Sequence, residues 1–471
     1  MRWNPRVSRA LPLVTAAAVM LSACNGGASS TSAPVPPLNN PQLSAPAQSP
    51  ISPAHHRHSS KGKIQHVVII VQENRSFNNL FYGFPGATTA TYGYNTSGQK
   101  ITLQPVTLGT NWDIEHDSGG FFAACNGTGS IPGTNCQMNG FDNEGVGCGG
   151  RSNPCPNQNP PYSYVPHSET KPYFDMGKQY VLADQMYASN FDASSFISHQ
   201  YIISAQAVSA VNFPYGAWGC PGGSGDRIST VGQQRQIPSG HEVVCWDPKT
   251  LGDELDTAGL PWAFYAVSYS GYPWIWSAYQ AIKHIYYGND WKTDIISPPS
   301  QFLTDVTNGK LRTVSWVTPT WTNSDHAGSG STSGPQWVAS VVNTIGQSQY
   351  WNSTAIFIFW DDYGGWYDPE APAYVDYDGL GMRIPMLIVS PYAKKGHVSH
   401  VPYEHGSILR FIEDQFGLGQ LSASDTRANS PEKDAFDFKK PPRAFKVIPT
   451  VLGKEYFLHR QPPDHHVPDD Q

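Results

Sequence analysis

Charged side chains are scarce in this chain: Asp, Glu, Lys and Arg make up only 14% of its 471 residues, with a net charge of −7. Proteins that bind nucleic acid through its phosphates usually carry a surplus of Lys and Arg, so we expect no nucleic-acid partner. Aromatic residues reach 12%. This combination favours a large, aromatic-lined exported domain over a highly charged cytosolic one.

Long apolar segments are also lacking. Arg2, Arg6 and Arg9 precede an apolar run at 10–23 that is too short to span a bilayer comfortably. The run ends in Leu21-Ser22-Ala23-Cys24, which resembles the bacterial lipobox, a motif whose cysteine is lipidated. We therefore predict a signal peptide at 1–24, lipidation of Cys24, and a lipoprotein anchored to a membrane surface in the periplasm or on the cell surface. A plain secretory signal and a secreted protein are the alternative.

No pair of cysteines has the CxxC spacing of common metal sites. Six cysteines remain besides Cys24, namely Cys125, Cys136, Cys148, Cys155, Cys220 and Cys245. An even number in an exported protein predicts up to three disulfides, with metal binding as the competing interpretation. Cys220–Cys245 is the pair we favour.

The composition divides the chain into segments. Residues 25–62 are rich in Pro, Ser and Ala and predict a flexible linker, in which His55, His56 and His58 are either solvated or metal-binding. We expect a catalytic domain at 63–460 and a short C-terminal tail at 461–471.

Short β-branched or aromatic runs alternate with amphipathic segments in that domain. The runs predict buried strands at 64–71, 262–267, 313–317, 355–360 and 384–390, and the amphipathic patterns predict helices at 335–347 and 405–416. This alternation predicts an α/β fold with a mostly parallel central sheet and helices on both faces. The turn-rich stretch 86–166 is expected to elaborate the rim of the site.

Polar clusters follow two of the predicted strands directly. Glu73 and Asn74 come after the first strand, and Asp361 and Asp362 come after the strand at 355–360. Adjacent buried acids need a cation, and carboxylate and amide oxygens suit a hard divalent metal. Each cluster alone is equally consistent with a solvated turn, but together they predict one metal site at the carboxyl edge of the sheet.

A serine and two histidines complete the candidate site. Asp192 or Ser194 would cap a helix that begins near Ser195, and a serine in that first turn meets an anion at the positive helix end. His326 and His116 would ligate metal, donate a proton, or serve as structural hydrogen-bonding groups.

These segments resemble, in order, a bacterial phosphoesterase family that contains acid phosphatases and phospholipases C. The most specific match is Glu73-Asn74-Arg75-Ser76-Phe77, which is similar to the ENRSF signature of that family. Ser324-Asp325-His326, Trp360-Asp361-Asp362-Tyr363-Gly364-Gly365 and the run 383–392 support it, and the similarity covers roughly 63–417. The resemblance implies an alkaline-phosphatase-like α/β fold.

The resemblance also implies roles for individual residues. The implied metal ligands are Glu73, Asn74, Asp361 and Asp362, with the nucleophile Ser195 (Ser194 in reserve) beside the metal, and His326 and His116 near the leaving group and the phosphate. Three positions depart from the pattern: Asn78 replaces Asp, Pro369 replaces His, and Ser198-His199-Gln200 stands in place of Pro-Asn-Arg. The last departure favours the acid-phosphatase-like branch.

The expected function is metal-dependent hydrolysis of a phosphate-ester substrate through a phosphoserine. Cleavage of phospholipid headgroups by a phospholipase C is the alternative, and a non-catalytic surface lipoprotein or binding module is the alternative of another class. All-oxygen ligands favour Ca or Mg, whereas histidine ligands would admit Mn or Zn. Metal identity, substrate and oligomeric state stay open.

Overall fold

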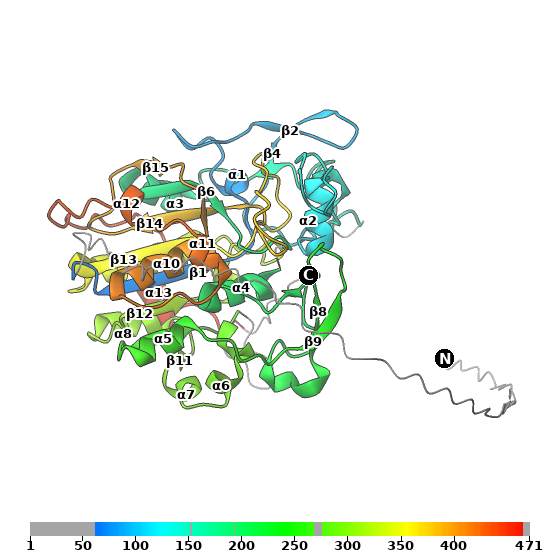
Figure 1. Ribbon diagram of the computed structural model, residues 1–471. Helices are drawn as coiled ribbons and strands as arrows, with labels where there is room; N and C mark the ends of the chain where they lie inside the picture. Colours follow the sequence, from blue (N-terminus) through cyan, green and yellow to red (C-terminus); the bar gives the residue numbers. More distant parts are fainter. Residues whose placement is uncertain (1–61, 151–152, 193, 268–275, 465–471) are drawn as a thin grey trace, which may run out of the picture. The chain divides into compact units, whose positions relative to one another are not determined.

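The computed structural model describes residues 62–464, except 151–152, 193 and 268–275. Its centre is a nine-stranded sheet in the order β11-β10-β12-β1-β13-β14-β6-β15, with β16 also pairing with β6 (Figure 1). Only β14 runs antiparallel to its neighbours in this sheet. The strands of this sheet are β1 (His66–Gln72), β6 (Val181–Tyr187), β10 (Trp262–Tyr265), β11 (Ile295–Ile296), β12 (Val314–Val317), β13 (Thr354–Trp360), β14 (Arg383–Val389), β15 (His397–Ser399) and β16 (Tyr403–Glu404).

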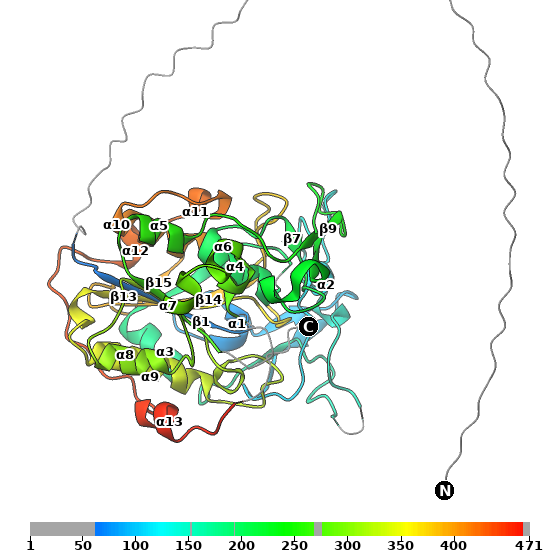
Figure 2. The ribbon, with the colours of Figure 1, turned by 90° about the horizontal axis from the view of Figure 1, so that it is seen from below.

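Helices cover both faces of the sheet, which Figure 2 shows nearly edge-on. One face carries α3 (Lys171–Gln179), α8 (Gln301–Thr307), α9 (Gly334–Gly346) and α13 (Lys454–His459). The other carries α4 (Ser195–Ser204), α5 (Leu251–Thr257), α10 (His405–Phe416) and α11 (Ala423–Arg427). The predicted α/β architecture with a mostly parallel sheet is therefore confirmed.

Burial explains why these segments form these elements. All seven residues of β13 are buried, as expected for a central strand covered by helices on both sides. In α9 a proline occupies the first turn, and the apolar residues from Trp337 to Ile345 are buried. The strand β6 has no predicted counterpart, because Asp184 and Gln185 interrupt its apolar run.

Smaller elements surround the sheet at the carboxyl ends of its parallel strands. They are α1 (Phe77–Leu80), α2 (Ser118–Cys125), the β2–β3 hairpin (Tyr92–Tyr94, Lys100–Thr102), the pair β4–β5 (Gln104–Pro105, Ser163–Tyr164) and the sheet β7-β8-β9 (Ala210–Val211, Arg227–Thr230, Gly240–Val243). Three short helices, α6 (Lys283–Tyr286), α7 (Asp290–Thr293) and α12 (Glu432–Ala435), lie elsewhere.

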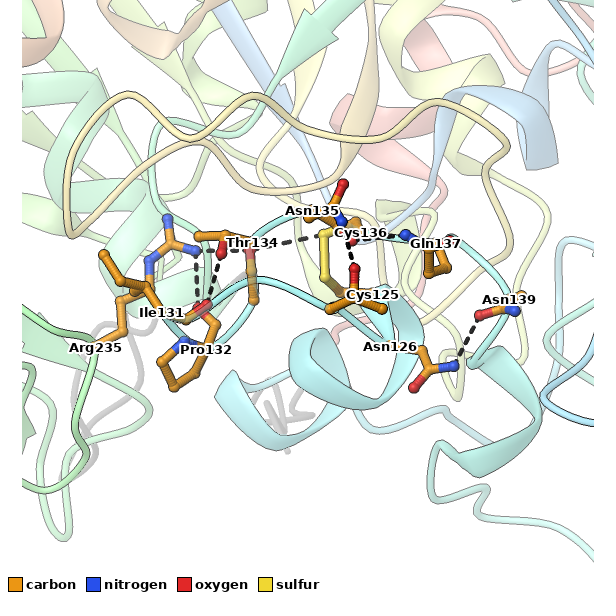
Figure 3. The surroundings of a disulfide bond; sticks show 12 residues. Cys125, Asn126, Ile131, Pro132, Thr134, Asn135, Cys136, Gln137, Asn139 and Arg235 are labelled. Carbon is orange, nitrogen blue, oxygen red and sulfur yellow. Dashed lines mark hydrogen bonds between the residues drawn. A yellow bond between two sulfur atoms is a disulfide. The ribbon is translucent and has the colours of Figure 1, made fainter.

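Three disulfides join the six cysteines as Cys125–Cys136, Cys148–Cys155 and Cys220–Cys245. This confirms the favoured pair and the expected number. Figure 3 shows the first disulfide at the end of α2, where Arg235 reaches across from a distant segment and donates to the carbonyl of Gly133 at 2.9 Å. Loops with few apolar residues are thus held by covalent bonds and by a buried guanidinium.

The signal peptide, Cys24 and the linker histidines lie outside the described residues. Among the residues that are described, no helix has the length and apolarity needed to cross a membrane. At the other end, Gln461 bonds to Asn323 at 3.0 Å and Asp464 accepts from the Thr322 amide at 2.7 Å. The start of the expected tail therefore contacts the domain.

Candidate active site

The two acidic clusters meet because β1 and β13 are parallel neighbours. Gln72 pairs with Trp360 at the ends of these strands, and the next residues continue in contact. The Arg75 amide donates to the Asp362 carbonyl at 3.0 Å, and the Asn74 amide donates to Asp361 Oδ1 at 3.1 Å. The two loops therefore leave the sheet side by side.

Gly364 allows this close approach of the two loops. Its φ is +60°, and a Cβ there would lie 2.2 Å from the Asn74 carbonyl oxygen. Any side chain would be strained in that conformation and would also collide with the Asn74 backbone. The glycine after the acidic pair thus keeps Asp361 and Asp362 next to Glu73 and Asn74.

Ser195 is the first residue of α4, with Ser194 at the N-cap position. Its hydroxyl donates to Asp362 Oδ2 at 3.2 Å and lies 3.3 Å and 3.5 Å from the terminal nitrogen and oxygen of Asn74. Ser194 points elsewhere, because its hydroxyl bonds to Asp192 Oδ2 at 3.1 Å and to the Asn212 carbonyl at 3.0 Å. The side chain of Ser194 forms no cap hydrogen bond, so the expected capping is absent, and Ser195 alone of the two reaches the acidic cluster.

Two histidines reach the same asparagine from separate loops. Nδ1 of His116 lies 2.6 Å from the Ile114 carbonyl, and Nδ1 of His326 lies 2.5 Å from the Ala327 carbonyl. A carbonyl only accepts, so Nδ1 carries the proton in each neutral ring and Nε2 is an acceptor. With these neutral tautomers, the terminal atom of Asn74 that lies 2.7 Å and 3.1 Å from the two Nε2 atoms is its nitrogen, which donates to each. The reversed amide would require a proton on both Nε2 atoms.

This orientation turns the amide oxygen of Asn74 toward other oxygens. It lies 3.0 Å from Glu73 Oε2 and 3.1 Å from Asp361 Oδ1, and Ser195 Oγ is 3.5 Å away. Asp361 Oδ2 accepts no hydrogen bond from any described residue. Asp361 Oδ1 accepts from the Asn74 backbone amide, but buried oxygens this close to one another still repel unless a cation lies among them. The donor set therefore fits a hard divalent metal.

His199 is a further member of the site to which sequence reasoning gave no role. Its Nε2 lies 3.0 Å from Glu73 Oε1 and 3.9 Å from Asp361 Oδ2. Its ligand atom lies within 4.8 Å of those of the two carboxylates, as in a metal-binding group. The spacing of four residues from Ser195 places both side chains on one face of α4, and this signal could have identified His199.

His405, at the start of α10, lies behind the carboxylates and was also missed. Burial lowers the pKa of His405 to about 4, although the charge of Asp361 opposes the shift. The ring is therefore neutral at ordinary pH. It adds no positive charge behind Asp361 and leaves that carboxylate free to face a cation.

Arg75 and Asp325 support the loop that carries His326. The buried guanidinium of Arg75 donates to the carbonyls of Asp325 at 2.7 Å and of Leu108 at 2.8 Å. The Asp325 carboxylate accepts from Tyr173 at 2.7 Å and from Trp360 at 3.0 Å. Burial raises the pKa of Asp325 to about 6, against the opposing effects of Tyr173 and Arg75. The middle residue of Ser324-Asp325-His326 is thus structural.

At two of the departures from the family pattern, the side chains present bond to groups other than these oxygens. Asn78 exchanges hydrogen bonds with the Ala90 backbone, at 2.7 Å and 3.2 Å, and so holds a loop. Asp368, which precedes Pro369, is paired with the buried Arg383 at 2.9 Å.

The structure brings together all the predicted catalytic and metal-site residues, and every one is buried: Glu73, Asn74, His116, Ser195, His326, Asp361 and Asp362.

The chain is similar to several known proteins. A family model described as the Phosphoesterase family matches residues 64–419. The non-hemolytic phospholipase C of Pseudomonas aeruginosa is 25% identical over 83% of this chain, which spans only 59% of that relative. Phospholipase C B of Mycobacterium tuberculosis is 25% identical over 81% of this chain and 79% of the relative. A solved structure from Vibrio parahaemolyticus is described as a protein in the alkaline phosphatase superfamily. Its alignment with this chain covers 80% of this chain and 73% of the Vibrio chain, with 10% sequence identity and a TM-score of 0.37.

Proposed function

The chain belongs to the Phosphoesterase family, and on that basis we propose that it hydrolyses phosphate esters through a covalent intermediate on Ser195. The observation that carries this proposal is the position of Ser195 Oγ, at the first residue of a ten-residue helix and 3.2 Å from Asp362 Oδ2. The helix N-terminus attracts a phosphate, and the carboxylate can accept the hydroxyl proton as the oxygen attacks.

The reaction has two displacements. Ser195 Oγ bonds to phosphorus, its proton passes to Asp362 Oδ2, and the bond between phosphorus and the ester oxygen breaks. Water, which gives a proton to the histidine that protonated the leaving oxygen, then attacks the phosphoserine. The bond between phosphorus and Ser195 Oγ breaks, Oγ takes back the proton from Asp362 Oδ2, and inorganic phosphate is released. Each step moves negative charge onto the phosphoryl oxygens, so groups that stabilise this charge determine the rate.

We infer that Glu73, Asn74, Asp361, Asp362 and Ser195 hold a divalent cation, with His199 beside it. When bound, such a cation would polarise the phosphoryl oxygens and favour the alkoxide of Ser195. Oxygen ligands favour Ca or Mg, and His199 would admit Mn or Zn. Supporting this inference, the Asn74 oxygen faces two carboxylate oxygens at 3.0 Å and 3.1 Å.

His116 and His326 are the proposed proton donors. Their Nε2 atoms approach Asn74 from the side opposite its amide oxygen and lie within hydrogen-bonding distance of its nitrogen. With a proton on Nε2, either ring would donate to a phosphoryl oxygen or to the leaving alkoxide. We assign the leaving group to His326 and the phosphate to His116.

The decisive experiment compares Ser195→Ala with Ser194→Ala on an aryl phosphate. Ser195→Ala should abolish turnover while leaving metal binding, measured calorimetrically, in place. Ser194→Ala is the matched control, since its hydroxyl faces away, and it should retain most of the activity. Acid quenching during turnover should trap one phosphoryl group on the peptide containing Ser195. Wild-type turnover by Ser195→Ala would overturn the nucleophile assignment.

A second candidate is cleavage of phospholipid headgroups, which the names of the relatives favour. Release of a phosphorylated headgroup from phosphatidylcholine, measured beside hydrolysis of soluble monoesters, separates the two activities. Activity in neither assay with every divalent metal would support a non-catalytic binding module. The complete set of candidate ligands argues against that module.

We also propose that the protein is exported and lipidated at Cys24. The supporting feature is Leu21-Ser22-Ala23-Cys24 after a short apolar run. Cys24→Ser should move the protein from the membrane fraction to the soluble fraction, and an unchanged distribution would contradict lipidation.

A further inference from the structure

A cleft of about 450 Å³ lies between the segment after β14 and the segment after α12, and several basic side chains line it. We call it the basic cleft, and its cationic lining residues are Lys394, Lys395, Lys440 and Arg443, with His397 and Asp437 beside them. The proposed catalytic reaction uses none of these residues.

The local charge differs in sign from that of the whole chain. Residues 391–397 and 432–446, together with Lys63, contain eight Lys and Arg but only three Asp and Glu, a charge of +5 in a chain of −7. Two of the acids already have partners: Asp437 pairs with Lys440 at 3.0 Å, and Asp434 pairs with His397 at 3.1 Å. Lys440 is therefore partly neutralised by Asp437, but cations still outnumber carboxylates in this region.

The cleft has one fixed cation and several exposed ones. Arg443 donates to the carbonyls of Gln179 at 3.2 Å and Ala393 at 2.7 Å, and its guanidinium lies over the Tyr180 ring at 5.0 Å. Lys395 and Lys440 are exposed at the rim. A fixed cation with exposed cations around it can bind several phosphate groups at once. Phosphates that lie in one plane, as in a layer of lipid headgroups, match this arrangement.

The position of the basic cleft in the fold gives it an orientation. β14 is antiparallel to β13, so the segment after β14 lies at the edge where β1 and β13 begin. The acidic pair follows the opposite end of β13 directly, and Ser195 lies beside it, with Oγ 3.2 Å from Asp362 Oδ2. A seven-residue strand such as β1 separates the two edges by about 20 Å.

The chain also enters the domain beside the cleft. Lys63 donates to the Phe438 carbonyl and lies 5.4 Å from the Tyr392 ring, and Tyr392 lines the cleft. The segment before Lys63 leads back to the predicted anchor at Cys24. A tether from the membrane would therefore reach the domain beside the basic cleft.

We propose that the basic cleft binds the anionic headgroups of a lipid surface and holds the domain with its site facing away from that surface. The inference deepens the proposed function and rests on it for the substrate: a site turned away from the bilayer acts on water-soluble phosphate esters. An acyl chain and a basic patch together give more stable attachment than either alone.

The test uses the full chain carrying Cys24→Ser and vesicles of phosphatidylcholine with or without phosphatidylglycerol. We expect sedimentation only with the anionic vesicles, weakened by added salt. The triple variant Lys394→Gln, Lys395→Gln and Lys440→Gln should bind roughly 100-fold more weakly, the order expected for three lysines near an anionic surface. The matched control removes the same charge at three exposed lysines far from the cleft, Lys100 on β3, Lys283 on α6 and Lys292 on α7, and should bind as the parent does.

The outcomes separate this inference from the proposed function. Both triple variants should hydrolyse a soluble aryl phosphate at the parent rate. If the proteins bind vesicles as expected but none of them hydrolyses the aryl phosphate, the proposed function is overturned and the docking surface is not. Equal binding to both vesicles, or equal loss in the two triple variants, would overturn the docking surface. Saturation of the cleft by inorganic phosphate without vesicle binding would assign it to a soluble anion instead. Headgroup release from the vesicles by the bound protein would overturn the orientation.

Discussion

Replacing Arg75 by methionine should weaken both the fold and the proposed chemistry. The Arg75 side chain is buried and donates to the carbonyls of Asp325 and Leu108, and at 3.4 Å to Asn79 Oδ1. Its guanidinium also lies 4.6 Å from the Trp366 ring. Methionine would occupy much of the same volume and would supply none of the hydrogen bonds.

The expected loss follows from those bonds. Each buried carbonyl left without its donor costs about 1–3 kcal/mol. The two short bonds therefore predict a loss of about 3–5 kcal/mol, which is a large part of the 5–15 kcal/mol typical of a folded domain. Because Asp325 precedes His326, the loop should also loosen, and kcat should fall more than KM rises.

The loss should grow with pH because of Asp325. Burial raises the pKa of this carboxyl from 3.8 to about 6. The folded protein therefore binds more protons than the unfolded chain across this window, and the contribution of Asp325 to stability falls as pH rises through it. Without the positive charge of Arg75 the folded pKa would rise further. The pH range over which stability falls would then extend to higher pH, and the free energy of unfolding would fall by about 1.4 kcal/mol more for each further unit of pKa.

Denaturant unfolding at pH 5 and pH 8, with aryl phosphate kinetics, measures both effects. Arg75→Met should lose more stability at pH 8 than at pH 5, and Arg75→Lys, which keeps the charge, should show less of this difference. Arg235→Met is the matched control, because Arg235 is another buried arginine, bonded to the carbonyls of Tyr377 and Gly379 at 2.9 Å. It should destabilise without changing kcat. An active Arg75→Met protein with wild-type stability at both pH values would refute the reasoning.

Three other changes have equally definite outcomes. Burial, together with Asp425, raises the pKa of Glu413 from its usual 4.5 to about 9, so ionisation of Glu413 reduces the stability of the fold as pH rises between these values. Glu413→Gln should therefore raise Tm by more at pH 8 than at pH 5. A gain in Tm that does not depend on pH would contradict this. Replacing Cys220 and Cys245 by alanine opens a 25-residue loop and should cost about 3 kcal/mol in denaturant unfolding, and no loss would show that the disulfide is not stabilising. His199→Gln should weaken divalent metal affinity about 10- to 100-fold in calorimetry with little change in the Tm of the metal-free protein, whereas unaltered affinity would remove His199 from the site.

Local patterns were enough to predict the central strands and the acidic clusters. The β-branched run before Glu73 and the aromatic run before Asp361 are strongly apolar, and strands buried on both faces require such runs. Parallel neighbours then place their following residues at one edge, which is why two clusters nearly 290 residues apart could be assigned to one site. The strand β6 was not predicted, because its polar residues Asp184 and Gln185 interrupt the apolar run.

Residue types and order along the chain by themselves determined the fold class, the number of disulfides and the residue types that suit a cation. They could not choose between Ser194 and Ser195, because two adjacent serines differ only in where their side chains point. That orientation is set by the start of α4 at Ser195 and by the Asn212 carbonyl, which accepts from Ser194. They gave no role to His199 or Arg75, whose partners belong to other segments. The separation of the basic cleft from the site is likewise tertiary, because it depends on β14 running against β13. Hydrophobic periodicity is a property of short windows, whereas the orientation of a side chain and the edge it occupies depend on contacts between segments far apart in the chain.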